Sequence, residues 1–178
     1  MTKTTRLPLA ALASFFAAAI FLGPVSAHAA GEAKSIGTFN DWVAYQFTED
    51  GNKVCYMASA PKKHVEGGAK RGEIFALVTN RPAEGSKNVF SYIAGYTYKP
   101  GSEVSLTIGD QKFSLFTQDD TAWAADAATD AKIAEALRKG SGFVVKGTSS
   151  RGTATTDTFS LKGSGSAHDA INKECGTP

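Results

Sequence analysis

The stretch Glu103-Val-Ser-Leu-Thr-Ile-Gly-Asp-Gln-Lys-Phe-Ser-Leu-Phe-Thr117 contains two short runs of apolar, aromatic and β-branched residues. Residues of these types favour strands. Gly109-Asp110 separates the two runs and suits a primed two-residue hairpin turn, because glycine reaches positive φ without a steric cost. The stretch therefore predicts an antiparallel hairpin with strands at 103–108 and 111–117.

Similar runs recur on both sides of this hairpin, separated by clusters of Gly, Pro, Asn and Asp. They predict six further strands, at 42–47, 53–59, 73–80, 89–98, 142–147 and 155–161. Ser149-Ser-Arg-Gly152 is expected to close a second hairpin, with Gly152 in a left-handed conformation. Eight short strands in a chain of this length predict a mainly β, antiparallel, β-sandwich-like single domain.

Two segments have helical periodicity. In residues 129–139 the apolar side chains fall on one face, Asp130 lies in the first turn, and Gly140 follows as a stop signal. Residues 166–174 begin with Ser166 and Asp169 in the spacing of a capping box and lead directly to Cys175. We expect two short helices, the second too short to be stable without packing or a tether.

The N-terminal segment has the pattern of a secretory signal peptide. Lys3 and Arg6 precede an apolar run from Leu7 to Leu22, and Ala27-His28-Ala29 has the small residues of a cleavage site, which predicts a signal peptide at 1–29 and a mature domain at 30–178. A retained membrane anchor is the alternative, but the run is short for a bilayer-spanning helix. We therefore expect no transmembrane segment after cleavage.

Cleavage would remove two of the 19 basic residues and none of the 17 acidic residues, so the mature domain would have a net charge of about zero. This balance and the predicted export both argue against a nucleic-acid partner.

The two cysteines, Cys55 and Cys175, both lie in the predicted mature domain. Because exported chains meet an oxidising compartment, a Cys55–Cys175 disulfide is the first expectation, and its long loop would contribute roughly 5 kcal/mol. One alternative is a reactive Cys55 thiol with His64 as its base. Another is a zinc site formed by Cys55, His64, His168 and Cys175, although these spacings differ from the close pairs of structural zinc sites.

Other patterns give no cofactor site. Asp119, Asp120, Asp126 and Asp130 do not follow the alternation of a calcium-binding loop, and loop solvation or helix capping explains them. The glycine-rich pieces match neither nucleotide-binding nor serine-hydrolase motifs. The sequence predicts no cofactor, no metal and no catalytic residue.

Two segments are candidate contact surfaces. The first is a basic loop that carries Lys62, Lys63, His64, Lys70 and Arg71 and could meet anionic head groups or a glycan. The second is an aromatic surface on the predicted strand 89–98, formed by Tyr92, Tyr96 and Tyr98. Apolar residues on both faces of that strand favour a different interpretation, in which it is a central strand and the tyrosines belong to the core.

Several segments, in order along nearly the whole mature chain, give it a resemblance to a known family. They are Phe39-Asn-Asp-Trp42, Cys55 with Pro61-Lys62, Gly95-Tyr-Thr-Tyr-Lys-Pro-Gly-Ser102, Lys112-Phe-Ser-Leu-Phe-Thr117, Ala122-Trp123, Gly147 to Gly163, and Cys175. With these segments the chain resembles the invasion-associated locus B family of exported proteins from Gram-negative bacteria. Ser164 and His168 depart from the family pattern, which argues against a family-wide role for His168.

The resemblance implies a small, mainly β protein of the periplasm, the outer membrane or the cell surface, named for a link to host-cell entry in pathogenic members. It supplies no catalytic residues. We therefore expect a non-enzymatic binding role with an unknown envelope or host-surface partner. The alternative is a periplasmic hydrolase, which a deep polar pocket with convergent carboxylates or histidines would favour.

Overall fold

The computed structural model describes residues 31–65 and 71–177. The predicted signal peptide at 1–29 and Lys70 of the basic loop lie outside these residues. Within the described part of the chain, no helix is long and apolar enough to cross a bilayer.

In the described residues, eleven strands form one antiparallel sheet with the order β1-β2-β3-β5-β6-β9-β8-β7-β10-β11-β4. The strands are β1 (Lys34–Phe39), β2 (Trp42–Glu49), β3 (Asn52–Ser59), β4 (Lys63–Val65), β5 (Phe75–Arg81), β6 (Ser86–Ile93), β7 (Glu103–Ile108), β8 (Gln111–Gln118), β9 (Thr121–Trp123), β10 (Gly142–Thr148) and β11 (Ala154–Ser160). The predicted mainly β, antiparallel class is confirmed.

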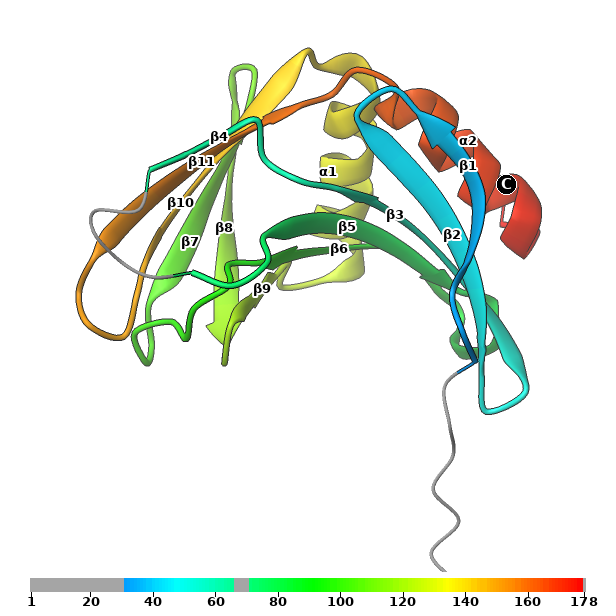
Figure 1. Ribbon diagram of the computed structural model, residues 1–178, viewed down its shortest axis with the longest axis horizontal. Coiled ribbons are helices and arrows are strands. Elements are labelled where there is room, and N and C mark those ends of the chain that lie inside the picture. Colours follow the sequence, from blue (N-terminus) through cyan, green and yellow to red (C-terminus); the bar gives the residue numbers. More distant parts are fainter. Residues whose placement is uncertain (1–30, 66–70, 178) are drawn as a thin grey trace, which may run out of the picture.

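The sheet bends strongly, so that its two halves approach each other (Figure 1). The indole Nε1 of Trp42 in β2 donates to the carbonyl oxygen of Ser160 in β11 at 3.0 Å, although these strands lie near opposite ends of the strand order. The Tyr92 ring of β6 meets the Phe159 ring of β11 edge-on, with centroids 6.1 Å apart. Side chains from both halves therefore share one core, as in a sandwich.

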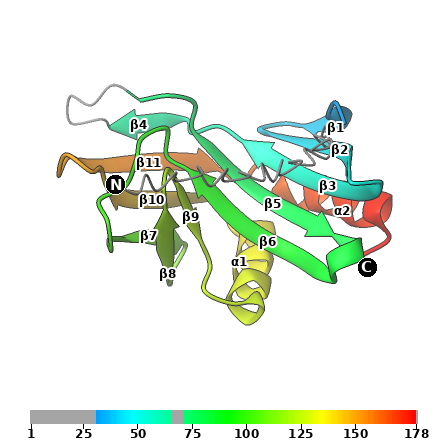
Figure 2. The ribbon, with the colours of Figure 1, turned by 90° about the horizontal axis from the view of Figure 1, so that it is seen from below.

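Residues 60–62 carry the chain from one half of the sheet to the other. They connect β3 to β4, which pairs with β11 at the far end of the strand order (Figure 2). The Lys62 amide donates to the Thr158 carbonyl at 2.8 Å and begins this pairing. The two halves are thus joined by a short covalent connection as well as by the core.

Two helices, α1 (Ala127–Lys139) and α2 (Ser164–Cys175), lie on the same side of β2, β3, β5 and β6 as the core (Figure 1). Ile133 and Leu137 of α1 and Ile171 of α2 are fully buried, in one cluster with Trp42 and Phe90 of the sheet. A short 3-10 helix, η1 (Pro82–Glu84), connects β5 to β6. Both predicted helices are present.

The two predicted hairpins are confirmed. Ile108 pairs with Gln111 around Gly109, whose φ is 56°. Thr148 pairs with Ala154 around a turn in which Gly152 has a φ of 81°. The positive φ values explain why glycine occupies both positions.

Three details differ from the sequence-based expectation. Strands β1, β4 and β9 were not predicted, because they are short or largely polar. The predicted strand 89–98 ends at Ile93, since Gly95 has a φ of 69° and turns the chain. Helix α2 begins at Ser164 after Gly163, without a side-chain cap, so the capping box at Ser166 is wrong.

Candidate binding surface

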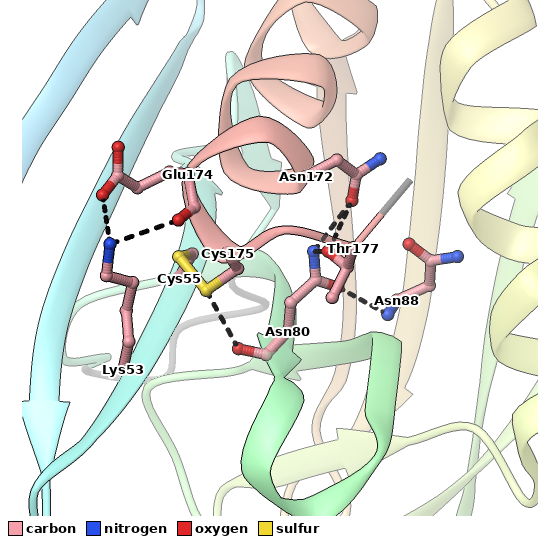
Figure 3. The surroundings of a disulfide bond; sticks show 8 residues. All are labelled: Lys53, Cys55, Asn80, Asn88, Asn172, Glu174, Cys175 and Thr177. Carbon is pink, nitrogen blue, oxygen red and sulfur yellow. Dashed lines mark hydrogen bonds and ion pairs between the residues drawn. A yellow bond between two sulfur atoms is a disulfide. The ribbon is translucent and has the colours of Figure 1, made fainter.

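Cys55 of β3 and Cys175 at the end of α2 form a disulfide, with an S–S distance of 2.05 Å and a Cα–Cα distance of 6.0 Å (Figure 3). The predicted disulfide is confirmed. Because both sulfurs are in this bond, neither is available as a nucleophile or as a zinc-binding thiolate. Next to it, Lys53 Nζ and Glu174 Oε1 form an ion pair of 2.6 Å.

A polar network holds α2 beside the disulfide (Figure 3). Asn80 Nδ2 donates to Asn172 Oδ1 at 2.8 Å and to Thr177 Oγ1 at 2.9 Å. Its Oδ1 accepts a hydrogen bond from the backbone N–H of Asn88 at 2.8 Å. Asn80 is fully buried, and these three bonds use both ends of its amide group.

His168 belongs to the same region of α2 and is neutral. Arg138 lies 2.8 Å from its Nδ1, and since the guanidinium only donates, Nε2 carries the proton and donates to Asn88 Oδ1 at 2.8 Å. Burial, reinforced by the positive charge of Arg138, lowers the pKa of His168 to about 4. These contacts assign His168 a structural role at the α1–α2 contact.

Arg71, a candidate of the basic loop, is buried between the two halves of the sheet. Its guanidinium forms a bidentate pair with Asp157 at 2.8 and 2.7 Å, and its Nε donates to the Ala94 carbonyl at 2.9 Å. The Tyr92 hydroxyl donates to the same carboxylate, and burial together with this bond raises the pKa of Tyr92 far above its usual value. With a side chain only 1% exposed, Arg71 is not available to an external partner.

The remaining described residues of the basic loop lie at the edge of the sheet. Lys62 pairs with Asp41 at 2.5 Å, while Lys63 and His64 lie in the exposed strand β4. Lys63 and His64 therefore stay candidates for a contact surface.

The predicted aromatic surface at Tyr92, Tyr96 and Tyr98 lies largely inside the protein. Tyr92 and Tyr98 are 1% and 3% exposed. Tyr96 is half-buried, packs against the Arg71 guanidinium at 5.0 Å from its ring centroid, and lies 2.6 Å from the Thr155 hydroxyl. This position agrees with the interpretation of the tyrosines as core residues.

A different aromatic surface lies on the opposite side of the sheet from the helices. We call it the outer aromatic face, and it consists of Tyr45, Phe47, Tyr56, Phe75, Leu77, Ile93, Phe116 and Trp123. The register places these residues side by side, because Tyr45 pairs with Tyr56 and Trp123 pairs with Phe116. The Tyr45 and Tyr56 rings stack with centroids 5.0 Å apart, and Phe116 is 48% exposed. Within the described residues, no helix covers this side (Figure 1).

The outer aromatic face is hollowed by a groove with a volume of about 460 Å³. We call it the aromatic groove, and its lining residues are Gly31, Ala33, Phe47, Tyr56, Leu77, Thr79, Arg81, Ser91, Ile93, Thr121 and Trp123. Arg81 is the one charged residue among these described lining residues. Sequence reasoning missed this surface, although Phe75, Leu77 and Thr79 alternate with the buried Ala76, Val78 and Asn80 in β5.

Comparison with known proteins shows the family to which the chain belongs. The family model described as Invasion associated locus B (IalB) protein matches residues 42–172. The chain belongs to the invasion associated locus B family. The resemblance seen in the sequence is thus confirmed, and all eight residues of the outer aromatic face lie within the matched residues. A search of curated proteins found no match.

The fold of this invasion associated locus B family member is similar to a solved structure described as the crystal structure of invasion associated protein b from Bartonella henselae. The two chains share 15% sequence identity, with a TM-score of 0.55, over 79% of this chain and 98% of that chain. At this identity the similarity shows a common fold.

Proposed function

We propose that this protein is an exported, non-enzymatic binding protein of the cell envelope, and that the outer aromatic face is its contact surface. Membership of the invasion associated locus B family, the N-terminal sequence pattern and the Cys55–Cys175 disulfide support export. In pathogenic relatives the partner would belong to the host-cell surface.

The observation that carries the proposal is the set of half-exposed aromatic rings on one side of the sheet. The opposite side is filled by the helices and by the second half of the sheet. Contiguous apolar patches on a protein surface mark interaction sites, and tyrosine, tryptophan and phenylalanine are enriched in interfaces. The three rings of Phe47, Tyr56 and Trp123 line one groove, which gives a partner a defined site.

The chemistry of the groove supports binding over the alternative of a periplasmic hydrolase. Its described lining contains no carboxylate, imidazole or thiol, the groups that most often act as acids, bases or nucleophiles. The buried Asp157 and His168, by contrast, are engaged by Arg71 and Arg138 inside the fold.

The test measures retention of envelope fractions and of host-cell surface material on immobilised residues 30–178. The variant carries Phe47→Ser and Phe116→Ser, which remove two rings from the outer aromatic face. The control carries Lys132→Ser and Lys146→Ser, two exposed residues elsewhere. We expect the face variant to lose at least 80% of the retained material, since a few anchor residues dominate most interfaces, by roughly 2 kcal/mol each.

Circular dichroism and thermal melting first establish that both variants are folded. Equal retention by the wild type, the face variant and the control variant would contradict the proposal. A third variant, Lys63→Ser with His64→Ser, examines the remaining basic-loop candidates, and loss of retention in this variant alone would move the contact surface to β4.

A further inference from the structure

The pairing register determines how the aromatic groove is arranged. Phe47 of β2 and Arg81 of β5 lie at one end, and Trp123 of β9 lies at the other. Leu77, which is opposite Ser91 in β6, and Thr79 form the floor between them. From Trp123 to Arg81 the groove spans two strand spacings of about 4.8 Å, from β9 through β6 to β5, and four residues of β5 at about 3.3 Å each, which gives a diagonal length of roughly 16 Å.

The floor of the groove offers few hydrogen-bonding groups. It is the face of a sheet, so the backbone N–H and C=O groups beneath it already pair with neighbouring strands. A strand-like peptide in the groove would leave its own backbone groups without partners, which is unfavourable. A sugar carries a hydroxyl on nearly every ring carbon, whereas the lining is mostly apolar, with the hydroxyls of Tyr56, Thr79, Ser91 and Thr121, the indole N–H of Trp123 and the Arg81 guanidinium as its polar side-chain groups. A hydrocarbon chain requires no hydrogen bonds and matches the apolar rings.

The single charged group in the described lining gives the groove a polarity. Arg81 is 31% exposed, and its Nε lies 3.3 Å from Glu49 Oε2 and 3.6 Å from Glu84 Oε1. Both glutamates are more exposed than Arg81. The closest contact of each glutamate is to Nε, so the terminal amino groups of the guanidinium are the donors that an anion at this end of the groove would meet.

We propose that the aromatic groove binds a free long-chain fatty acid, with its hydrocarbon chain along Leu77 and Thr79 and its carboxylate beside Arg81. The inference rests on the proposed function, because it assigns a ligand class to the same face. The length of roughly 16 Å fits a chain such as those that fill one leaflet, about 15 Å, of a hydrocarbon core about 30 Å thick.

The experiment titrates residues 30–178 with decanoate, dodecanoate and tetradecanoate, each below its micelle concentration, and follows the fluorescence of Trp123. The second tryptophan, Trp42, is fully buried and gives a constant background. We expect a blue shift of the emission and a dissociation constant that falls about fourfold for each added CH₂ group. Dodecyltrimethylammonium, which has the opposite charge, should bind more weakly than dodecanoate.

Three variants locate the site. Arg81→Gln should weaken dodecanoate binding about three- to tenfold and leave dodecanol binding within twofold, because only the carboxylate meets the guanidinium. Thr79→Phe places a ring on the floor and should abolish binding of both ligands. Arg151→Gln removes an exposed arginine from a distant turn and should change neither affinity.

The proposal is overturned if no fatty acid shifts the emission, or if Thr79→Phe binds dodecanoate as the wild type does. Sedimentation equilibrium gives a separate outcome: a dimer that Thr79→Phe dissociates would make a second copy the occupant instead. Absence of fatty-acid binding, combined with loss of envelope retention in the Phe47/Phe116 variant, would refute this inference and leave the proposed function standing.

Discussion

The disulfide is expected to supply a large part of the stability of this domain. Replacing Cys55 and Cys175 together by alanine opens a loop with a sequence separation of 120 residues. In the chain-entropy treatment, closing a loop of that length reduces the entropy of the unfolded chain enough to stabilise the fold by about 5 kcal/mol at 25 °C. Since domains are typically stable by about 5–15 kcal/mol, the variant would be marginal.

The assay is equilibrium unfolding in urea without reductant, with wild type and variant compared by circular dichroism. We expect a free energy of unfolding lower by about 5 kcal/mol. Hydrogen exchange adds a local readout: protection should fall first in α2, whose other attachments include the Asn80 network, the contacts of Arg138 with His168 and Asp169, and the buried Ile171. A decrease below about 1 kcal/mol would refute the entropic argument, because the loop length alone determines its size.

Three further predictions concern buried ionisable groups. The pKa of His168 is about 4 in the folded state, against an ordinary histidine value of 6.5. The free energy of unfolding should therefore fall by up to about 3 kcal/mol as the pH decreases from 6.5 to 4. Urea unfolding at several pH values should show that His168→Gln flattens this part of the profile. Asp130 has the opposite pH dependence. Burial raises its pKa to about 6, although its Oδ1 accepts a hydrogen bond from the Phe90 backbone N–H. The free energy of unfolding should therefore fall as the pH rises from 3.8 to 6. Asp130→Asn should therefore be up to about 3 kcal/mol more stable than the wild type at pH 7.5, and the two proteins should be equally stable near pH 3.5. If the two proteins were equally stable at about pH 7.5, the raised pKa would be contradicted. Arg71→Met should lower the free energy of unfolding by about 3–5 kcal/mol, because it leaves the Asp157 carboxylate buried without its partner, and an additional Asp157→Asn change should recover part of the loss.

Local residue patterns predicted the hairpins and the helices, because their signals lie within a few positions. Gly109 and Gly152 occupy conformations that few other residues adopt readily, and the apolar spacing of Ile133 and Leu137 defines the buried side of α1. The disulfide followed from the predicted compartment, since the chain has two cysteines. The capping box failed because α2 already begins at Ser164, which leaves Ser166 and Asp169 inside the helix, where Asp169 pairs with Arg138 at 2.6 Å.

The binding surface depended on information that is not local. In β5, Ala76 and Val78 face the core while Phe75 and Leu77 face outward, although all four are apolar. The bend of the sheet and the packing of the two helices determine which side is covered. Likewise, Arg71 was predicted to belong to the exposed basic loop, but the fold places its guanidinium beside Asp157, 86 positions away in the sequence.

The Cys55–Cys175 cross-link also determines how the protein would respond to mechanical force. If the chain is pulled at its two ends, the 120-residue interval between the cysteines cannot extend, and this shields roughly 400 Å of contour length at about 3.3–3.6 Å per residue. The described residues before Cys55 can extend by only about 80 Å. They include β1 and β2, and β2 contributes Phe47 to the aromatic groove. Tension would therefore open one wall of the groove first, while the residues inside the cross-linked interval are shielded from the load.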